Sequence, residues 1–381
     1  MPKRAILIVL DGCGAGEAPD ATRFGDTDHP STIRHVWERA GGINAPNLAA
    51  CGLFAAGGVR GANPTTAKWG RLRELSEGKD SVTGHWEMMG IRTSVPFPTY
   101  PEGSPADLVA TFEARIGMHV LGNRAASGTT IIEELGAEHI ATGSPILYTS
   151  ADSVFQVACH EEVVPLERLY EICRLGREVC AAPHNLERVI ARPFIGRPGA
   201  FTRTGGRKDY PLTPPPNLID AVGDVLGIGV VPELFAGRGF RQTHRTTCNA
   251  EHSIALRSAL KSDARFIFAN FEDFDMLYGH RNDPSGFAMA FEAFDGVLAE
   301  TLAALGQDDL LVLTADHGND PTTVSTDHAR EYVPVCVIGA GVGPLGDTDG
   351  MSSIGLTVAG HLGVEFDPGF GRNLLGVMEK P

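Results

Sequence analysis

The sequence predicts an α/β protein with a mainly parallel sheet flanked by helices and a smaller α/β domain inserted into it. Short, continuous apolar segments end in polar clusters, which is typical of parallel strands buried on both faces. A helical pattern of suitable length stands between two such segments, as in a βαβ unit. Apolar residues make up 43% and charged residues 21% of the 381 residues, which is the composition of a folded globular protein.

Four segments are predicted as strands of the main sheet by their continuous apolar character: 5–10, 266–271, 310–314 and 333–338. Between the second and the third lies a predicted helix at 284–305. Its apolar residues recur at three- and four-residue steps, as on one helix face: Phe287, Phe291, Phe294, Leu298 and Leu302. Strand, helix and strand in this order predict a βαβ unit.

Two proline-rich breaks, around 92–104 and at 211–216, predict the domain boundaries, because proline cannot continue a helix or an inner strand. The core is then discontinuous, comprising 1–94 and 214–381, and 95–213 forms the inserted domain. The inserted domain has predicted elements of its own: strands at 146–148 and 188–192 and a helix at 166–179.

The net charge of −15, from 32 basic and 47 acidic residues, argues against nucleic acid as a partner. No apolar segment approaches the length needed to span a membrane. Seven cysteines without a CxxC pair predict free thiols in a cytoplasmic protein. Because the net charge is negative, an anionic substrate must be held by a local cluster of cations or by metal.

Acidic and histidine residues follow three of the predicted strands: Asp11 after 5–10, Asp275 and His280 after 266–271, and Asp316 and His317 after 310–314. The carboxyl ends of parallel strands share one crevice, where carboxylates this close together need a compensating cation. These side chains offer oxygen and nitrogen donors and no thiolate, a ligand set that predicts a metal site. His328 offers a further imidazole to this site. The alternative for a single aspartate is a helix cap.

The segment 78–87, GKDSVTGHWE, places the Ser81 hydroxyl among lysine, aspartate and histidine. An alcohol nucleophile must be activated by a base or a metal, which this setting supplies. The alternative is that the hydroxyl caps a helix. Thr83, in the same segment, is the competing phosphoryl acceptor.

Phrases along nearly the whole chain, in the same order, resemble the phosphopentomutase family: LDGCGAGEAPD at 10–20, GKDSVTGHWE at 78–87, YTSADSVFQ at 148–156, RVIARPF at 188–194, NFEDFD at 270–275 with YGHR at 278–281, and TADHG at 314–318 with TDHARE at 326–331. The Asp-His-Gly phrase alone marks only the wider alkaline phosphatase-like superfamily. The resemblance implies an alkaline phosphatase-like core with an inserted cap domain.

The resemblance further implies an enzyme that interconverts pentose 1-phosphates and 5-phosphates with two divalent metal ions, usually Mn²⁺. It assigns one ion to Asp11, Asp316 and His317, and the other to Asp275, His280 and His328. Ser81 stands at the position of the phosphorylated nucleophile, which forms a sugar bisphosphate intermediate. A bisphosphate such as glucose 1,6-bisphosphate primes the family's enzymes.

The inserted domain is expected to bind the sugar phosphate. Arg188 and Arg192 share one face of a strand, and the segment 201–208 adds Arg203, Arg207 and Lys208. Arginine suits bidentate recognition of phosphate, whereas Lys208 fits a solvated face equally well. The resemblance assigns the sugar hydroxyls to Asp152.

One position departs from the family, because Val230 stands where its members have a lysine that contacts the substrate phosphate. Arg238, Arg241 and Lys208 are the cations available to replace it.

Two alternative functions are considered for the protein: a related metal-dependent phosphomutase or phosphohydrolase for another sugar phosphate, and a phosphate-binding protein without turnover. The presence of Ser81 beside six metal ligands argues against mere binding.

Overall fold

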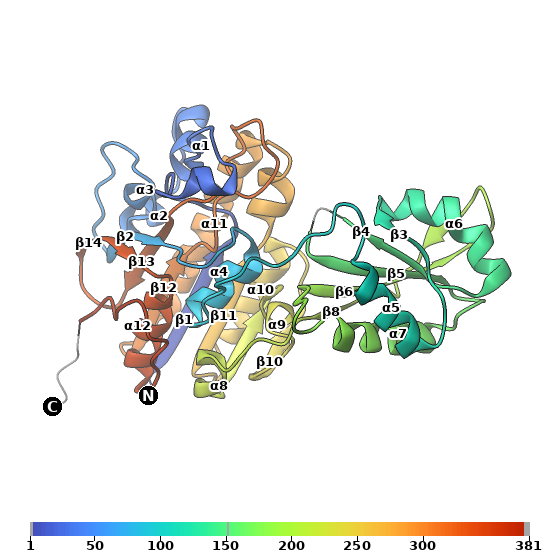
Figure 1. The fold of residues 1–381 in the computed structure, drawn as a ribbon. Coiled ribbons are helices and arrows are strands. Elements are labelled where there is room, and N and C mark those ends of the chain that lie inside the picture. Colours follow the sequence, from blue (N-terminus) through green and yellow to red (C-terminus); the bar gives the residue numbers. More distant parts are fainter. Residues whose placement is uncertain (1–2, 151, 377–381) are drawn as a thin grey trace. The chain divides into compact units, whose positions relative to one another are not determined.

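The computed structural model describes residues 3–150 and 152–376, which separate into two compact units (Figure 1). The core unit comprises the residues up to 95 and those from 214 onward, and the inserted unit comprises 96–213. The boundaries expected from the sequence are 94/95 and 213/214. Each unit has a sheet and helices of its own.

The core unit is built on an eight-stranded sheet in the order β10-β9-β11-β1-β12-β13-β2-β14. Its centre consists of three parallel neighbours, β11 (Phe266–Phe271), β1 (Arg4–Leu10) and β12 (Asp309–Thr314), whose side chains are almost all buried. β9 (Val225–Ile228) and β10 (Phe240–His244) continue the parallel part. The carboxyl ends of these strands therefore emerge at one edge of the sheet.

The antiparallel strand pairs of this sheet lie in its remaining part, beyond β12. β13 (Val333–Ile338) is a strand, as predicted, but it runs antiparallel to β12. Residues 315–332, which join the two, contain no helix to form a crossover, so the chain returns in the opposite direction. β2 (Ala67–Arg73) pairs antiparallel with β13, and β14 (Gly343–Asp349) pairs parallel with β2. The sheet is mainly parallel, which confirms the predicted class.

Helices lie on both faces of this sheet (Figure 1). In α11 (Pro284–Ala304) the predicted apolar face is buried, except that Leu302 is half-buried. The other helical elements are η1 (Ala21–Phe24), α1 (Thr32–Ala40), α2 (Pro46–Cys51), α3 (Leu53–Ala56), α4 (Ser81–Met88), α8 (Leu218–Val222), α9 (Val231–Leu234), α10 (Asn249–Ala259), η2 (Phe274–Gly279) and α12 (Ser352–Leu362).

The inserted unit has a smaller mixed sheet in the order β3-β4-β5-β6-β7, with β8 also paired to β6. Its strands are β3 (Leu121–Ala125), β4 (Ile146–Thr149), β5 (Val154–His160), β6 (Arg188–Ile195), β7 (Thr202–Arg203) and β8 (Lys208–Pro211). Helices α5 (Ala106–Ile116) and α7 (Leu166–Val179) enclose one apolar core with this sheet. Helix α6 (Gly128–Thr142) encloses a second with Ile146, Ala158 and Phe194.

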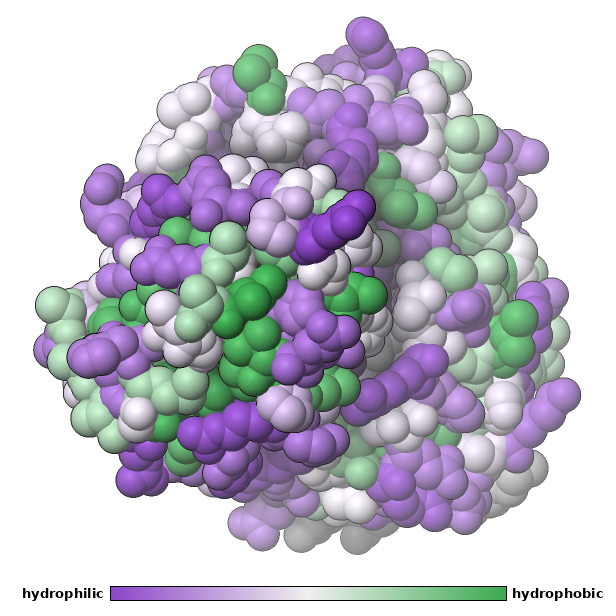
Figure 2. Space-filling model, turned by 90° about the vertical axis from the view of Figure 1, so that its right-hand side faces the viewer, coloured by the Kyte–Doolittle hydropathy of each residue, from purple (hydrophilic) through white to green (hydrophobic). Residues whose placement is uncertain are grey.

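Within the described ranges, no helix is long and apolar enough to cross a membrane. Hydrophilic residues occupy most of the face drawn in Figure 2, and hydrophobic residues gather in smaller areas between them. All seven cysteines are free thiols, and six of them are buried.

Candidate metal centre, nucleophile and anion pocket

Three neighbouring strands bring the predicted metal ligands of the core unit together. Asp11 follows β1, Asp316 and His317 follow β12, and Asp275 lies in η2, a π-helical turn after β11. Donor atoms of Asp11, Asp316 and His317 all lie within 4.8 Å of one another. The same holds for Asp275, His317 and His328, so that His317 belongs to both groups.

His280 joins the second group through its Nε2 atom, which lies 2.9 Å from Asp275 Oδ2 and 3.1 Å from His328 Nε2. Its Nδ1 lies 2.6 Å from the Thr326 carbonyl oxygen and donates to it, so Nε2 keeps a lone pair for a ligand. The Gly318 carbonyl orients His317 in the same way, at 3.1 Å from Nδ1. The structure thus brings all six predicted residues into one cluster.

Two carboxylates of this cluster are deeply buried and lie close together. Asp11 and Asp316 are 4% and 0% exposed, and Asp11 Oδ1 and Asp316 Oδ2 have no hydrogen-bond partner among the described residues. Burial, reinforced by Asp316 and Asp275, raises the pKa of Asp11 well above its usual value. A divalent cation would offset this repulsion, and carboxylate and imidazole are donors that such ions accept. The residues therefore fit the metal ions that the resemblance implies.

Two asparagines hold the carboxylates in place, and the sequence analysis missed both. Asn270 Nδ2 donates to Asp11 Oδ2 at 2.5 Å, and Asn319 Nδ2 donates to Asp275 Oδ1 at 2.6 Å. Both asparagines are fully buried. Asn270 left a signal in the sequence, since it is the one polar residue in the otherwise apolar strand β11.

Ser81 opens helix α4 with its hydroxyl oxygen 3.1 Å from His317 Nε2. The N-cap of this helix is Asp80, whose side chain accepts a hydrogen bond from the Thr83 backbone N–H. The Thr83 hydroxyl is buried and donates to the Asp80 carbonyl at 2.9 Å. The capping role therefore falls to Asp80 and Thr83, and only the Ser81 hydroxyl faces the metal ligands.

Arg330 anchors the loop that leads to Ser81, a role that the sequence analysis did not assign. Its guanidinium is 2% exposed and donates to the Gly78 carbonyl and to the Glu74 carboxylate, both at 2.6 Å. It also donates to Asp20 at 3.0 Å. Because Arg330 follows His328 by two residues, it links a metal-ligand loop to the nucleophile loop.

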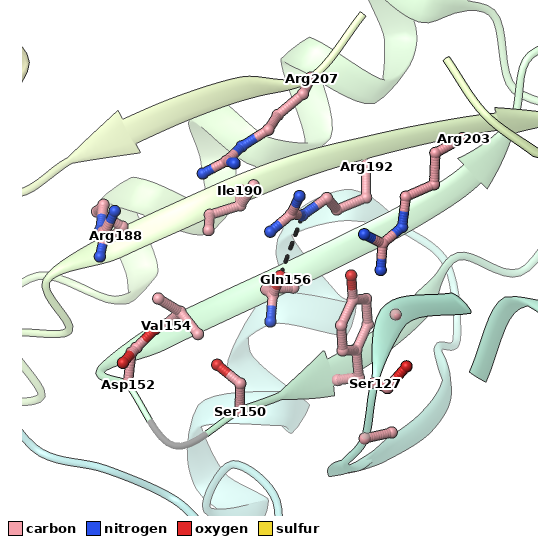
Figure 3. Close-up of a pocket in the computed structure, with 13 residues that line it drawn as sticks. Ser127, Ser150, Asp152, Val154, Gln156, Arg188, Ile190, Arg192, Arg203 and Arg207 are labelled. Atoms are coloured by element: carbon pink, nitrogen blue, oxygen red, sulfur yellow. Dashed lines mark hydrogen bonds between the residues drawn. The ribbon is translucent and has the colours of Figure 1, made fainter. Parts of the chain in front are cut away.

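The four predicted substrate residues, Asp152, Arg188, Arg192 and Arg203, all line one pocket of the inserted unit, which has a volume of about 350 Å³ (Figure 3). The pocket floor includes Gln156, whose Oε1 accepts a hydrogen bond from Arg192 Nε at 3.1 Å. Arginine side chains from two segments, Arg188 and Arg192 on β6 and Arg203 and Arg207 on 203–207, thus converge on one cavity.

The cations considered as replacements for the missing lysine have other partners. Arg238 Nε lies 2.7 Å from Asp220 Oδ1, and Arg241 Nε lies 2.7 Å from Asp224 Oδ1. Lys208 is exposed and lies over a tyrosine ring, in agreement with the solvated face considered for it. Arg238 and Arg241 are therefore engaged in ion pairs within the core unit.

Comparison with known proteins shows likeness over the whole chain. A phosphopentomutase of Symbiobacterium thermophilum is 47% identical over 391 residues, covering 99% of both chains. One of Carboxydothermus hydrogenoformans is 45% identical over 390 residues, covering 99% of this chain and 100% of the relative. Residues 236–366 match the Metalloenzyme superfamily.

Solved structures share the fold at low identity. The PH0037 protein of Pyrococcus horikoshii has a TM-score of 0.52 at 17% identity, covering 96% of this chain and 99% of that one. Leishmania mexicana phosphoglycerate mutase has a TM-score of 0.50 at 12% identity, covering 98% of both. These likenesses show a shared α/β fold. From its identity to curated relatives over nearly its full length, the chain belongs to the phosphopentomutase family.

Proposed function

We propose that the protein is a metal-dependent phosphopentomutase that interconverts the 1- and 5-phosphates of ribose or deoxyribose. The observation that carries this proposal is the Ser81 hydroxyl, 3.1 Å from His317 and free of any capping role, at the edge of a cluster of six metal-ligating side chains. Family membership supports the same activity. A binding protein has no use for a nucleophile in this position.

We assign two divalent ions, as Mn²⁺, to the cluster: one to Asp11, Asp316 and His317, and one to Asp275, His280 and His328. When bound, such ions polarise phosphoryl oxygens and lower the pKa of an alcohol nucleophile. The unpartnered carboxylate oxygens of Asp11 and Asp316 support this assignment. Asn270 and Asn319 keep Asp11 and Asp275 oriented toward the ions.

Ser81 donates a phosphoryl group to one position of the sugar and accepts one from the other. Phosphorylated Ser81 gives its phosphoryl group to the free hydroxyl of a sugar monophosphate, so that the bond to Ser81 Oγ breaks, a bond to the sugar oxygen forms, and the proton of that hydroxyl passes to Ser81 Oγ. The sugar bisphosphate then gives its other phosphoryl group to Ser81 Oγ, and the proton of Ser81 passes to the sugar oxygen that is released. The first turn of α4, with its N–H groups and dipole, stabilises a phosphate on Ser81.

We assign the recognition of the sugar phosphate to Asp152, Arg188, Arg192 and Arg203. Their presence in one pocket supports this assignment. The arginines provide the local positive charge that a protein of net charge −15 needs for an anionic substrate.

The test is to incubate the manganese-loaded protein with ribose 5-phosphate, after priming with glucose 1,6-bisphosphate. We expect ribose 1-phosphate to accumulate with little inorganic phosphate, because phosphoryl transfer returns the group to the sugar. Release of one phosphate per sugar would show a phosphohydrolase instead. No conversion of either ribose phosphate would contradict the proposal.

A further inference from the structure

His85 is a buried histidine beside the metal centre that belongs to neither predicted ligand set. It lies in α4, one turn after Ser81, and its side chain is fully buried. Its Nδ1 atom lies 2.8 Å from the Ser81 carbonyl oxygen and 3.4 Å from Asp316 Oδ2. Because a carbonyl oxygen only accepts hydrogen bonds, Nδ1 carries a proton and donates to Ser81. The ring therefore contacts both the proposed nucleophile and a predicted metal ligand.

The contact with Asp316 is made to the oxygen that is left for a metal ion. The other oxygen, Oδ1, accepts hydrogen bonds from the backbone N–H groups of Gly12 and His317, each at 3.1 Å. Oδ2 has no hydrogen-bond partner among the described residues, and His317 Nε2 lies 3.3 Å from it. The proton on His85 Nδ1 attracts this oxygen and helps to fix its direction.

Packing holds His85 in this place. A Cβ atom on Gly84, the preceding residue, would collide with the Asp316 carbonyl oxygen, so the bare backbone of α4 lies directly on residue 316. The His85 ring stacks on Phe268 of β11, with ring centroids 5.7 Å apart and an angle of 25° between the planes. The imidazole therefore has little freedom to turn away from Ser81 and Asp316.

Stability alone does not account for a histidine at this position. His85 Nε2 is buried and has no hydrogen-bond partner in the ranges that the structure describes. A buried polar atom without a partner destabilises a fold, whereas an apolar side chain of similar size would not. The imidazole is therefore explained by the contacts of its Nδ1 atom.

We propose that His85 is a positioning residue that fixes the first turn of α4, and with it Ser81, against the Asp316 carboxylate. The inference rests on the proposed function, in which Ser81 is the nucleophile and Asp316 is a metal ligand. The Ser81 hydroxyl lies 3.1 Å from His317 Nε2, and a displacement of about 1 Å in such a geometry can lower a rate about 10²-fold. His85 acts through Ser81 and Asp316, and it takes up neither a phosphoryl group nor a proton during the reaction.

The test compares three substitutions of His85 in the full-length, manganese-loaded protein. His85→Asn keeps a donor in place, since the amide nitrogen of asparagine is as many bonds from the backbone as Nδ1. His85→Gln moves the amide one bond farther, and His85→Leu removes the donor. We expect His85→Leu and His85→Gln to lower kcat about 10- to 100-fold and to weaken manganese binding about tenfold, with little change in the KM for ribose 5-phosphate. His85→Asn should recover most of both losses.

Manganese affinity is measured by electron paramagnetic resonance, which does not depend on turnover. Phosphorylation of Ser81 by glucose 1,6-bisphosphate is followed by intact-protein mass spectrometry and should slow in step with kcat. His252→Leu is the matched control, because His252 is also a fully buried histidine of the core unit and its Nδ1 atom lies 2.6 Å from the Thr246 hydroxyl oxygen. This variant should keep the manganese affinity and the kcat of the wild type.

Equal kcat and equal manganese affinity in His85→Asn and His85→Gln would overturn the proposal, because a side chain that only fills space does not depend on the position of its donor. This pair decides the matter if His85→Leu does not fold. Losses of similar size in His252→Leu would overturn the proposal as well. A wild-type chain without mutase activity would refute the proposed function, and the manganese affinities of the variants would still support or overturn the contact with Asp316.

Discussion

The metal centre of the core unit and the pocket of the inserted unit differ in the sign of the charge that they gather. Among the described residues, Asp11 and Asp316 keep buried carboxylate oxygens without a hydrogen-bond partner. The pocket of the inserted unit gathers the guanidinium groups of Arg188, Arg192, Arg203 and Arg207. The first arrangement favours cations, and the second favours anions. The net charge of the chain describes neither site.

The two sites also differ in how firmly the chain holds them. The metal ligands stand at the ends of buried strands, and asparagine side chains orient two of them. The pocket uses long side chains around an open cavity. We therefore expect the largest losses of turnover from substitutions of Ser81 and of the predicted metal ligands, and smaller, graded effects on affinity from substitutions elsewhere.

The largest effect is expected from Ser81→Ala. Because this variant removes the hydroxyl that lies 3.1 Å from His317 Nε2, phosphoryl transfer should fall by on the order of 10⁴-fold or more, as when a nucleophile is removed from other enzymes. Intact-protein mass spectrometry after incubation with glucose 1,6-bisphosphate should show no phosphoenzyme. Ser81→Thr, which keeps the hydroxyl, is the control. A phosphorylated Ser81→Ala protein would instead point to Thr83.

Loss of a metal ligand should come next. Asp275→Ala or His328→Ala should remove about one metal equivalent per chain and lower turnover by about a thousandfold or more, since a bound ion contributes several kcal/mol to transition-state stabilisation. Metal content is measured by plasma mass spectrometry. Asp273→Ala is the matched control, because Asp273 accepts from the Asn249 backbone N–H rather than facing the cluster. Full metal content and turnover in the ligand variants would refute the assignment.

A smaller effect is expected from the asparagines that orient the ligands. Asn319→Leu, which keeps the side-chain volume but removes the donor to Asp275, should weaken binding of one manganese ion about 10- to 100-fold. Asn270→Leu should do the same for the ion at Asp11. Manganese titrations followed by electron paramagnetic resonance give both constants. Wild-type affinity in both variants would show that the asparagines only fill space.

The smallest effect is expected at position 230, where the family has lysine. Val230→Lys should lower the KM for ribose 5-phosphate by about tenfold with little change in kcat, since it adds a charge-assisted contact made equally in ground and transition states. Val230→Met controls for length without charge.

Glu272 gives the competing outcome for that substitution. It accepts a hydrogen bond from the Val230 backbone N–H at 2.6 Å, and burial raises its pKa to about 7. If Glu272 captures the added lysine, the KM stays unchanged until Glu272→Gln is introduced as well. An unchanged KM in the double variant would show that substrate binding does not need a cation at position 230.

The strands and the clustering of the predicted metal ligands were predictable because their signal is local. An apolar segment followed by Asp11 or by Asp316 and His317 marks both a buried strand and the edge at which ligands gather. The direction of β13 was not predictable from its own residues, because it depends on the helix-free connection before it. The sharing of His317 between two ligand groups and the contact of His85 with Asp316 depend on packing between distant segments. No spacing in the sequence encodes them.

Because η2 is a π-helical turn, the relative positions of Asp275 and His280 depend on how many residues separate them rather than on which residues these are. Asp275 and His280 are five residues apart, and in an α-helix such residues point about 140° away from each other. In the structure the His280 N–H bonds the Asp275 carbonyl, five residues back, and the two side chains meet. Relaxation of this turn to α-helical winding at unchanged length would therefore turn one ligand away, whereas deleting one residue would leave the two four residues apart and on one face of an α-helix. An insertion in 276–279 should therefore be more damaging than a deletion of one residue.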